Sequence, residues 1–291
     1  MSIELRTGAE LAAEHAAKAA ARSGIDLRLL TEVSEIKQAT RLFADVWGTG
    51  TNEAGLPSDV VRALVHAGNY AAGAFAGDVL VGAVVAFLGF EDDELFAHSH
   101  ILGVSAEHRG ANIGFALKQH QRAWALSRGL RKVTWTFDPL VRRNAYFNLH
   151  KLGAEAAQYH ESFYGRMSDG INAGDESDRL VIVWNLDEPR VEEAASGRLR
   201  ELSSDELVTS GATVALSEDA GTPRTGSVSG RTVLCATPEN IVALRRSDVQ
   251  SALGWRRALR DTLGSAVQDG YRVAGFTRSG WYVLRREDAN E

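Results

Sequence analysis

The sequence has little cysteine and little lysine, and both shortages limit its chemistry. The one cysteine, Cys235, has no partner for an internal disulfide, and no cysteines and histidines cluster at zinc-ligand spacing. We therefore expect no metal site and a reducing compartment, the cytoplasm. Only five lysines stand against 27 arginines, and none lies in a short apolar strand flanked by cofactor-like glycines. This argues against covalent lysine catalysis.

Long apolar segments and an excess of positive charge are also missing. No run of 18 apolar residues occurs, and the first 24 residues contain acids and an alanine-rich run but no apolar centre of a signal peptide. We expect neither a membrane span nor export. The formal net charge of −6 argues against a phosphate-tracking surface, so nucleic acid is not an expected substrate.

The composition that is present is typical of a folded protein. Hydrophobic residues make up 44% and charged residues 24% of 291 residues, enough for one large domain or two ordinary ones. The alanine-rich residues 9–22 predict a surface helix that ends at Ser23-Gly24. We expect four parts: an N-terminal helix segment 1–24, a core 25–186, a linker 187–230 with one short helix, and a small α/β extension 231–291.

Within the core, apolar spacing predicts alternating helices and strands. One strand and two helices are followed by three strand-like runs that form an antiparallel meander, then by a polar loop, a helix, a strand, a helix and two more strands. The expected strands are 25–30, 70–75, 79–87, 97–104, 132–137, 154–159 and 180–186. A glycine-rich loop, Tyr164 to Asp178, is long enough to have a function. In the extension we expect a strand at 232–235, a long helix at 248–267 and a terminal hairpin.

The segment from Arg109 to Gly114 has the composition of an anion-binding loop. It joins a strand end to a helix start, where consecutive backbone N–H groups converge on phosphate oxygens. Gly110 and Gly114 allow close approach, and Asn112 tolerates a positive φ better than most residues. On its own the segment is equally typical of an ordinary strand-to-helix turn.

The order of elements together with this loop resembles the GNAT acetyltransferases over residues 25–186. The family motif Arg/Gln-x-x-Gly-x-Gly/Ala is met by Arg109, by Asn112 in the first glycine place and by Gly114. Residues 144–153 are similar to the family's second CoA-side helix. The resemblance implies an α/β (α+β) GNAT fold, with a mixed central sheet and helices on both faces, plus the C-terminal α/β extension.

The extension itself resembles a subgroup of predicted acetyltransferases. That subgroup carries Trp-Arg-x-x-x-Arg and Gly-Tyr-x-Val blocks, which are met here by Trp255, Arg256 and Arg260 and by Gly270-Tyr271-Arg272-Val273. Trp255, Arg256 and Arg260 fall on one side of a helix, which fits an anchor onto the core or a wall for an acidic acceptor.

The resemblance implies acetyl-CoA, or another short acyl-CoA, as co-substrate. Its diphosphate would bind the loop amides, its pantetheine the preceding strand end, and its thioester the place where strands 97–104 and 132–137 splay apart. The residues implied in binding are Leu102, Gly103, Val104, Arg109, Gly110, Ala111, Asn112, Ile113, Gly114 and Asn144.

Direct attack of an amine on the thioester needs a proton acceptor, for which His100 is the first candidate. His98 and His100 share one face of a strand, and a neutral imidazole is poised near physiological pH. A packed core histidine explains either residue equally well, and a metal pair is a weaker interpretation because no carboxylate motif accompanies it. Glu91, with Asp92 and Asp93, is an alternative that would act through water.

The proton donor for the departing thiolate is where this sequence differs from the family pattern. Many relatives have a tyrosine four residues before the glycine that ends this helix, and Leu149 stands there. Tyr146, on nearly the same helical face, and Tyr164, in the long loop, are the substitutes, although a packing aromatic is the more ordinary interpretation of each.

We therefore predict an N-acetyltransferase that transfers acetyl from acetyl-CoA to the amine of a small metabolite, with a homodimer left open. Leu149 motivates the alternatives: a non-catalytic acyl-CoA-binding or sensor module, or another reaction in the same cleft. The acidic chain also leaves transfer to basic peptides open.

Overall fold

The computed structural model describes residues 7–48, 56–165 and 175–286, arranged in two units. The first unit comprises residues 1–135 and 185–189, and the second comprises 136–184 and 190–291. Strand β5 (Lys132–Phe137) begins in the first unit and ends in the second. The domain boundaries expected from the sequence stay a prediction.

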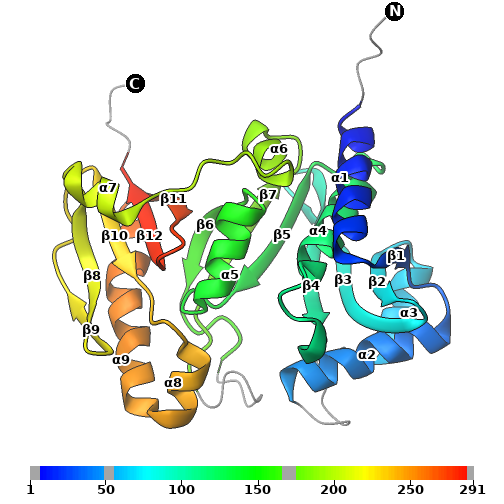
Figure 1. Cartoon of the computed structure of the whole chain (residues 1–291), viewed down its shortest axis with the longest axis horizontal. Helices are drawn as coiled ribbons and strands as arrows, with labels where there is room; N and C mark the ends of the chain where they lie inside the picture. Colours follow the sequence, from blue (N-terminus) through cyan, green and yellow to red (C-terminus); the bar gives the residue numbers. More distant parts are fainter. Residues whose placement is uncertain (1–6, 49–55, 166–174, 287–291) are drawn as a thin grey trace, which may run out of the picture. The chain divides into compact units, whose positions relative to one another are not determined.

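The first unit is built on a mixed sheet with the strand order β1-β2-β3-β4-β5 (Figure 1). Neighbouring strands are antiparallel except β4 and β5, which are parallel. Its strands before β5 are β1 (Asp26–Leu29), β2 (Tyr70–Ala76), β3 (Val79–Glu91) and β4 (Glu94–Val104). Its helices are α1 (Gly8–Ser23), α2 (Val33–Trp47), α3 (Ser58–His66), the 3₁₀ turn η1 (Ala106–His108) and α4 (Ile113–Leu126).

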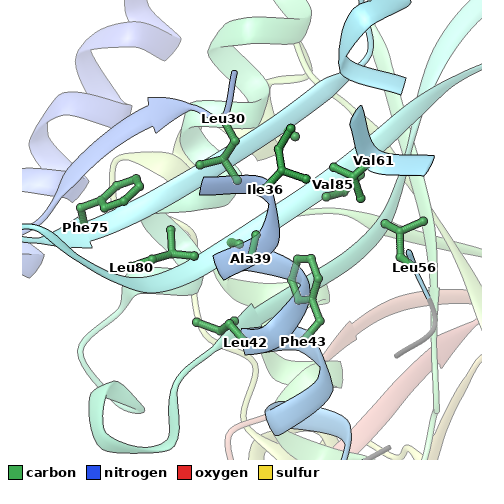
Figure 2. Close-up of a cluster of buried hydrophobic side chains, with 12 residues drawn as sticks. Leu30, Ile36, Ala39, Leu42, Phe43, Leu56, Val61, Phe75, Leu80 and Val85 are labelled. Carbon is green, nitrogen blue, oxygen red and sulfur yellow. The ribbon is translucent and has the colours of Figure 1, made fainter. Parts of the chain in front are cut away.

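Helices cover both faces of this sheet, which confirms the expected layering. On one face, Ile36, Ala39, Leu42 and Phe43 of α2 recur at helical spacing and pack with β2 and β3 in one buried apolar cluster (Figure 2). On the other face α4 lies so close that a Cβ at Gly82 would be 3.0 Å from Ile113. Glycine at this position therefore lets the helix approach the sheet.

Helix α1 covers α4 from outside and changes what α4 can bury. A capping box at Thr7 and Glu10 begins α1, and Gly24 in the left-handed conformation ends it. Its buried side consists of alanines, so the two helices come close together. As a result α4 buries polar side chains as well as apolar ones: Lys118, Gln119, Gln121 and Arg122.

The second unit has the strand order β7-β6-β11-β12-β10-β8-β9, with β10 and β8 parallel and the other neighbours with described register antiparallel. Its strands are β6 (Glu155–His160), β7 (Arg179–Asn185), β8 (Thr213–Asp219), β9 (Thr222–Thr225), β10 (Thr232–Ala236), β11 (Arg272–Phe276) and β12 (Trp281–Arg285). Its helices are α5 (Arg142–Tyr146), η2 (Phe147–Lys151), α6 (Pro189–Ala195), α7 (Ser204–Thr209), α8 (Ile241–Ser247), α9 (Val249–Leu259), η3 (Arg260–Gly264) and α10 (Ser265–Gln268).

A buried charge cluster lies inside the second unit. Arg256 donates two hydrogen bonds of 2.9 Å to Asp138 and one of 3.0 Å to Asp175. Arg245 also donates hydrogen bonds to both carboxylates. All four side chains are buried. Burial opposes the ionisation of Asp138, but the two guanidinium groups outweigh it and hold the pKa of its carboxyl well below the usual range. These arginines of the extension therefore neutralise acids of residues 136–184.

The Trp-Arg-x-x-x-Arg block thus serves as an anchor inside this unit. Arg260 bonds Asp178 and Glu176, and the indole N–H of Trp255 donates to the Gly221 carbonyl at 3.0 Å. Of the two roles that the spacing allowed, these contacts support the anchor.

The structure differs from the sequence-based elements at three places. Residues 187–230, expected to be a linker with one short helix, contain α6, α7, β8 and β9. The helix expected at 143–152 becomes a π turn from Phe147, and the helix expected at 248–267 contains a second π turn, η3. Residues 166–174 of the expected functional loop lie outside the described residues.

Candidate functional site

The loop between β4 and α4 adopts the geometry of an anion cradle. Gly110 has φ of +90° and Asn112 has φ of +58°, and nothing lies within 4 Å of where a Cβ on Gly110 would be. Asn112 precedes the first turn of α4, where backbone N–H groups lack acceptors within the helix. The left-handed conformation foreseen for Asn112 is confirmed. The open backbone at Gly110 and the free helix N–H groups fit a phosphate group.

The strand that leads into this loop is held by neighbouring contacts. The Ser105 amide donates to Val81 O at 2.9 Å, and the Ser105 hydroxyl is hydrogen-bonded to His108 Nδ1 at 2.9 Å. Arg109 is exposed and borders a surface cavity of about 550 Å³ whose opposite wall is α2. A guanidinium at this place is free to meet an anion on the loop.

Strands β4 and β5 pair over a short stretch only. Within the described residues their register comprises Ala97 with Val133 and His98 with Thr134, whereas β4 pairs with β3 from Glu94 to Val104. A shift in the β3 register places Ile101 and Ser99 opposite successive β3 residues, so His100 is the extra residue of a bulge. The C-terminal half of β4, with Leu102, Gly103 and Val104, thus lies past the residues that pair with β5.

Both histidines of β4 contact one aromatic ring. The Phe87 ring centroid lies 5.1 Å from that of His98 and 5.9 Å from that of His100. His98 Nδ1 is hydrogen-bonded to Thr134 Oγ1 at 2.9 Å, and burial, followed by the charges of His100 and Lys118, lowers the pKa of His98 to about 4. Burial also lowers the pKa of His100, whose side chain is more exposed. Both imidazoles are therefore neutral at pH 7, and His100 is the more accessible base.

The acidic alternative lies elsewhere on the hairpin. Glu91 and Glu94 are paired at its tip, and Glu91 forms an exposed ion pair with Lys132 at 3.3 Å. Six residues separate Glu94 from His100, about 20 Å of strand. Asp92 and Asp93 occupy the tight turn with positive φ. The structure thus does not bring these acids together with His100.

A buried polar pair below β4 has no counterpart in the sequence-based site. Lys118 Nζ of α4 donates to Ser99 Oγ and to Gln121 Oε1, each at 2.9 Å, and lies 3.7 Å from the Trp135 ring centroid. Burial lowers the pKa of Lys118 well below its usual range. No signal in the sequence marks this pair, because a lysine on a helix normally predicts a solvated side chain.

Tyr146 and Tyr164, the expected proton donors, and Asn144 belong to the second unit. The Tyr146 hydroxyl donates to Glu201 at 2.9 Å and accepts from Arg278 at 3.1 Å, and burial followed by the Glu201 contact raises its pKa. The exposed Tyr164 hydroxyl lies 3.2 Å from Thr136 Oγ1. The Tyr146 hydroxyl is thus already hydrogen-bonded to Glu201 and Arg278.

The residues around Leu149 offer no hydroxyl in its place. Leu149 is fully buried, and its carbonyl accepts from Arg190 at 3.1 Å. Asn144 donates its backbone N–H to the Val141 carbonyl at 2.9 Å, at the beginning of α5.

Comparison with known families agrees with this geometry. Residues 36–153 match the model of the acetyltransferase (GNAT) family. The chain contains a GNAT acetyltransferase domain. The match spans α2 to η2 and thus includes β4, the loop and α4. No curated protein matches the chain.

Several solved structures are similar to part of the chain at low sequence identity. An acetyltransferase of the GNAT family from Streptococcus pneumoniae is 14% identical, with 55% of this chain and 98% of that chain covered and a TM-score of 0.45. Aminoglycoside 6'-acetyltransferase type Ii is 15% identical, with 56% and 98% covered and a TM-score of 0.44. Arabidopsis thaliana Naa50, in complex with the bisubstrate analogue CoA-Ac-MVNAL, is 19% identical, with 55% and 97% covered and a TM-score of 0.41.

Two negative findings concern the part of the chain that the structure describes. Across residues 7–48, 56–165 and 175–286, no helix has the length and apolarity that crossing a membrane requires. Within the same residues, no group of three or more His, Cys, Asp or Glu side chains is placed to hold a metal ion.

Proposed function

We propose that this protein is an acyl-CoA-dependent N-acyltransferase that transfers acetyl from acetyl-CoA to the amine of a small metabolite. The observation that carries the proposal is the loop at the end of β4, where Gly110 and Asn112 hold left-handed conformations before the open N-terminus of α4. The family match over residues 36–153 supports it.

In this proposal the loop residues Arg109 to Gly114 bind the diphosphate through backbone N–H groups and the Arg109 guanidinium. Leu102, Gly103 and Val104 hold the pantetheine arm by backbone hydrogen bonds, because this half of β4 lies beyond its register with β5. Asn144 is proposed as a further contact with CoA. Acetyl-CoA supplies the activated acyl group.

His100 is proposed as the base that takes the proton from the acceptor ammonium, directly or through one water. Its imidazole is neutral at pH 7 and more accessible than that of His98, which is hydrogen-bonded to Thr134. Backbone N–H groups at Leu102 to Val104 are proposed to stabilise the developing oxyanion. Tyr146 and Tyr164 remain proposals for the proton donor to sulfur.

Calorimetry with acetyl-CoA and with CoA tests the binding half of the proposal. Arg109→Glu reverses the charge at the loop, so we expect it to weaken binding at least about tenfold, which corresponds to about 1.4 kcal/mol. Arg22→Glu makes the same charge change on α1 and is the matched control. Unchanged affinity in Arg109→Glu, or no binding by the unmodified protein at submillimolar concentration, contradicts the proposal.

Thiol release with a panel of amines tests the catalytic half. We expect release that depends on the acceptor, fastest with small amines. Transfer only to protein lysines would replace the small metabolite by a peptide acceptor. No release with any amine supports the second candidate, a module that binds acyl-CoA without turnover, which the buried Leu149 favours.

A further inference from the structure

A lysine and a serine meet at the point where the register between β4 and β5 ends. The last register pair is His98 with Thr134. The next residue of β4 is Ser99 and the next residue of β5 is Trp135. Lys118 Nζ contacts both, at 2.9 Å from Ser99 Oγ and 3.7 Å from the Trp135 ring centroid. The amine of α4 therefore lies across the beginning of the splay between the two strands.

This amine and this hydroxyl are deeply buried. Lys118 is 3% exposed and Ser99 is 6% exposed. Burial lowers the pKa of Lys118 well below its usual range, which makes its ammonium a better proton donor than a lysine in water. Gln121 Oε1 accepts a hydrogen bond from Lys118, while Gln121 Nε2, also buried, has no partner among the described residues. A buried donor without an acceptor indicates a place completed by a bound group.

The Ser99 hydroxyl has a proton to give. It accepts the hydrogen bond from Lys118, and no acceptor for its own proton is found within residues 7–48, 56–165 and 175–286. A hydroxyl that accepts from an ammonium is polarised toward donating its own proton. Ser99, next to the last register pair of β4 and β5, is thus a proton donor backed by a cation.

We propose that Ser99, in place of Tyr146 or Tyr164, is the catalytic proton donor to the CoA sulfur and that Lys118 acts through Ser99 by replacing that proton. The inference rests on the proposed function, which locates the thioester at this splay. It supplies the donor that Leu149, buried and without a hydroxyl, does not provide.

Each proton in the proposed acyl transfer has a donor and an acceptor. As the acceptor nitrogen bonds to the acyl carbon, the carbon–sulfur bond breaks and its electron pair stays on sulfur. Ser99 gives its hydroxyl proton to that sulfur and takes one from the Lys118 ammonium. Lys118, now a neutral amine, regains a proton from water after the products leave. The acceptor ammonium gives one proton to His100 before it attacks, and the second proton of the nitrogen goes to water as the amide forms.

Steady-state thiol release from acetyl-CoA tests the pair with four variants. We expect Ser99→Ala and Lys118→Met each to lower kcat about 10²-fold or more, with acyl-CoA affinity and the acceptor KM nearly unchanged. The double variant should be no slower than the slower single variant, because the two side chains act as a unit. Ser99→Thr keeps a hydroxyl and should recover at least about a tenth of the wild-type kcat.

Lys37→Met, at an exposed lysine of α2, is the matched control and should retain the wild-type rate. Folding is checked by circular dichroism and acetyl-CoA calorimetry. If Lys118→Met fails to fold, the comparison of kcat between Ser99→Ala and Ser99→Thr tests the proposal by itself. The proposal is wrong if folded Ser99→Ala keeps its kcat, if Ser99→Thr is as slow as Ser99→Ala, or if mass spectrometry finds an acyl group on Ser99, which would make it a nucleophile.

Failure of this inference and failure of the proposed function give different results. A wild-type protein that binds no acyl-CoA or releases no thiol contradicts the function itself. A wild-type protein that turns over, with variants at Ser99 that turn over equally well, contradicts only the role of Ser99 and Lys118.

Discussion

The bulge in β4 gives His100 more exposure than His98 while its surroundings still lower its pKa. The extra residue has no partner in the β3 register, and its ring rests against Phe87 at 5.9 Å. Burial disfavours the charged imidazolium, so the neutral form that can accept a proton persists to a lower pH than in water. This combination suits a base that works at physiological pH.

Replacing His100 by alanine should lower kcat by about two to four powers of ten and leave acyl-CoA affinity nearly unchanged. Because the pKa of His100 is lowered from 6.5, the base is protonated and inactive only below that value. Wild-type kcat should therefore fall as the pH drops below 6.5, and the variant should lose this dependence. Thiol release measured from pH 5 to 8 checks both expectations.

His66→Ala is the control for this variant, since His66 is exposed near the end of α3. A folded His100→Ala protein with normal turnover would assign the base to another group. Loss of folding would instead show that the ring serves packing against Phe87.

Asn112 and Lys118 show which side chains a single sequence can assign. The left-handed conformation of Asn112 follows from local chemistry, because asparagine between a strand and a helix favours it. The burial of Lys118 depends on β4 and β5, whose Ser99 and Trp135 it contacts and which lie outside its own helix. A lysine on a helix normally predicts a solvated side chain, so this contact could not be foreseen.

The junction of β4, loop and α4 depends on the conformation at Asn112 more than on any side-chain bond, since its side chain makes no capping hydrogen bond. Asn112→Val should destabilise the protein by about 1–2 kcal/mol, the cost of the left-handed region for a β-branched residue, and weaken acetyl-CoA binding. Asn112→Gly, which adopts this φ freely, should keep both stability and binding. Urea unfolding and calorimetry measure the two effects. Equal behaviour of the valine and glycine variants would contradict this role of the backbone.

The expected linker shows why some strands and helices escape sequence analysis. Strand β9 has four residues, most of them exposed, and α7 has six residues, none of them buried. Elements this short and polar leave no apolar period to recognise, because neighbouring chain segments rather than a core face stabilise them. By contrast, α2 presents four buried apolar residues at helical spacing, which is the pattern that predicts a helix after the first strand.

The stability of the second unit depends on charges that come from distant parts of the chain. Arg256→Met removes one cation from a buried cluster and leaves Asp138 and Asp175 with their bonds to Arg245. Breaking such a buried pair costs about 3–5 kcal/mol, so we expect a loss of that size in the free energy of unfolding. Arg257→Met, on the exposed side of the same helix, should cost little. Equal stability of the two variants, measured by urea unfolding, would show that the cluster is dispensable.

The fold of the family core was predictable from its motif and element order, whereas the partners of its buried acids were not. Asp138 follows a strand and looks like an ordinary turn residue in the sequence. Its partners lie 107 and 118 residues further along the chain, and no local pattern connects residues so far apart. The helical spacing of Arg256 and Arg260 indicated a shared face, but not which acids it would meet.

The distance along the chain between Asp138 and its arginines also sets an order of events while the protein is being made. When Asp138 leaves the ribosome, Arg256 is still 118 residues away. At about 5–20 residues per second, that interval lasts roughly 6–24 seconds. The first unit needs only residues 185–189 to be complete, so it can fold while the extension is still being translated. During that time Asp138 and Asp175 lack Arg256, so their buried cluster can form only after the extension has been translated.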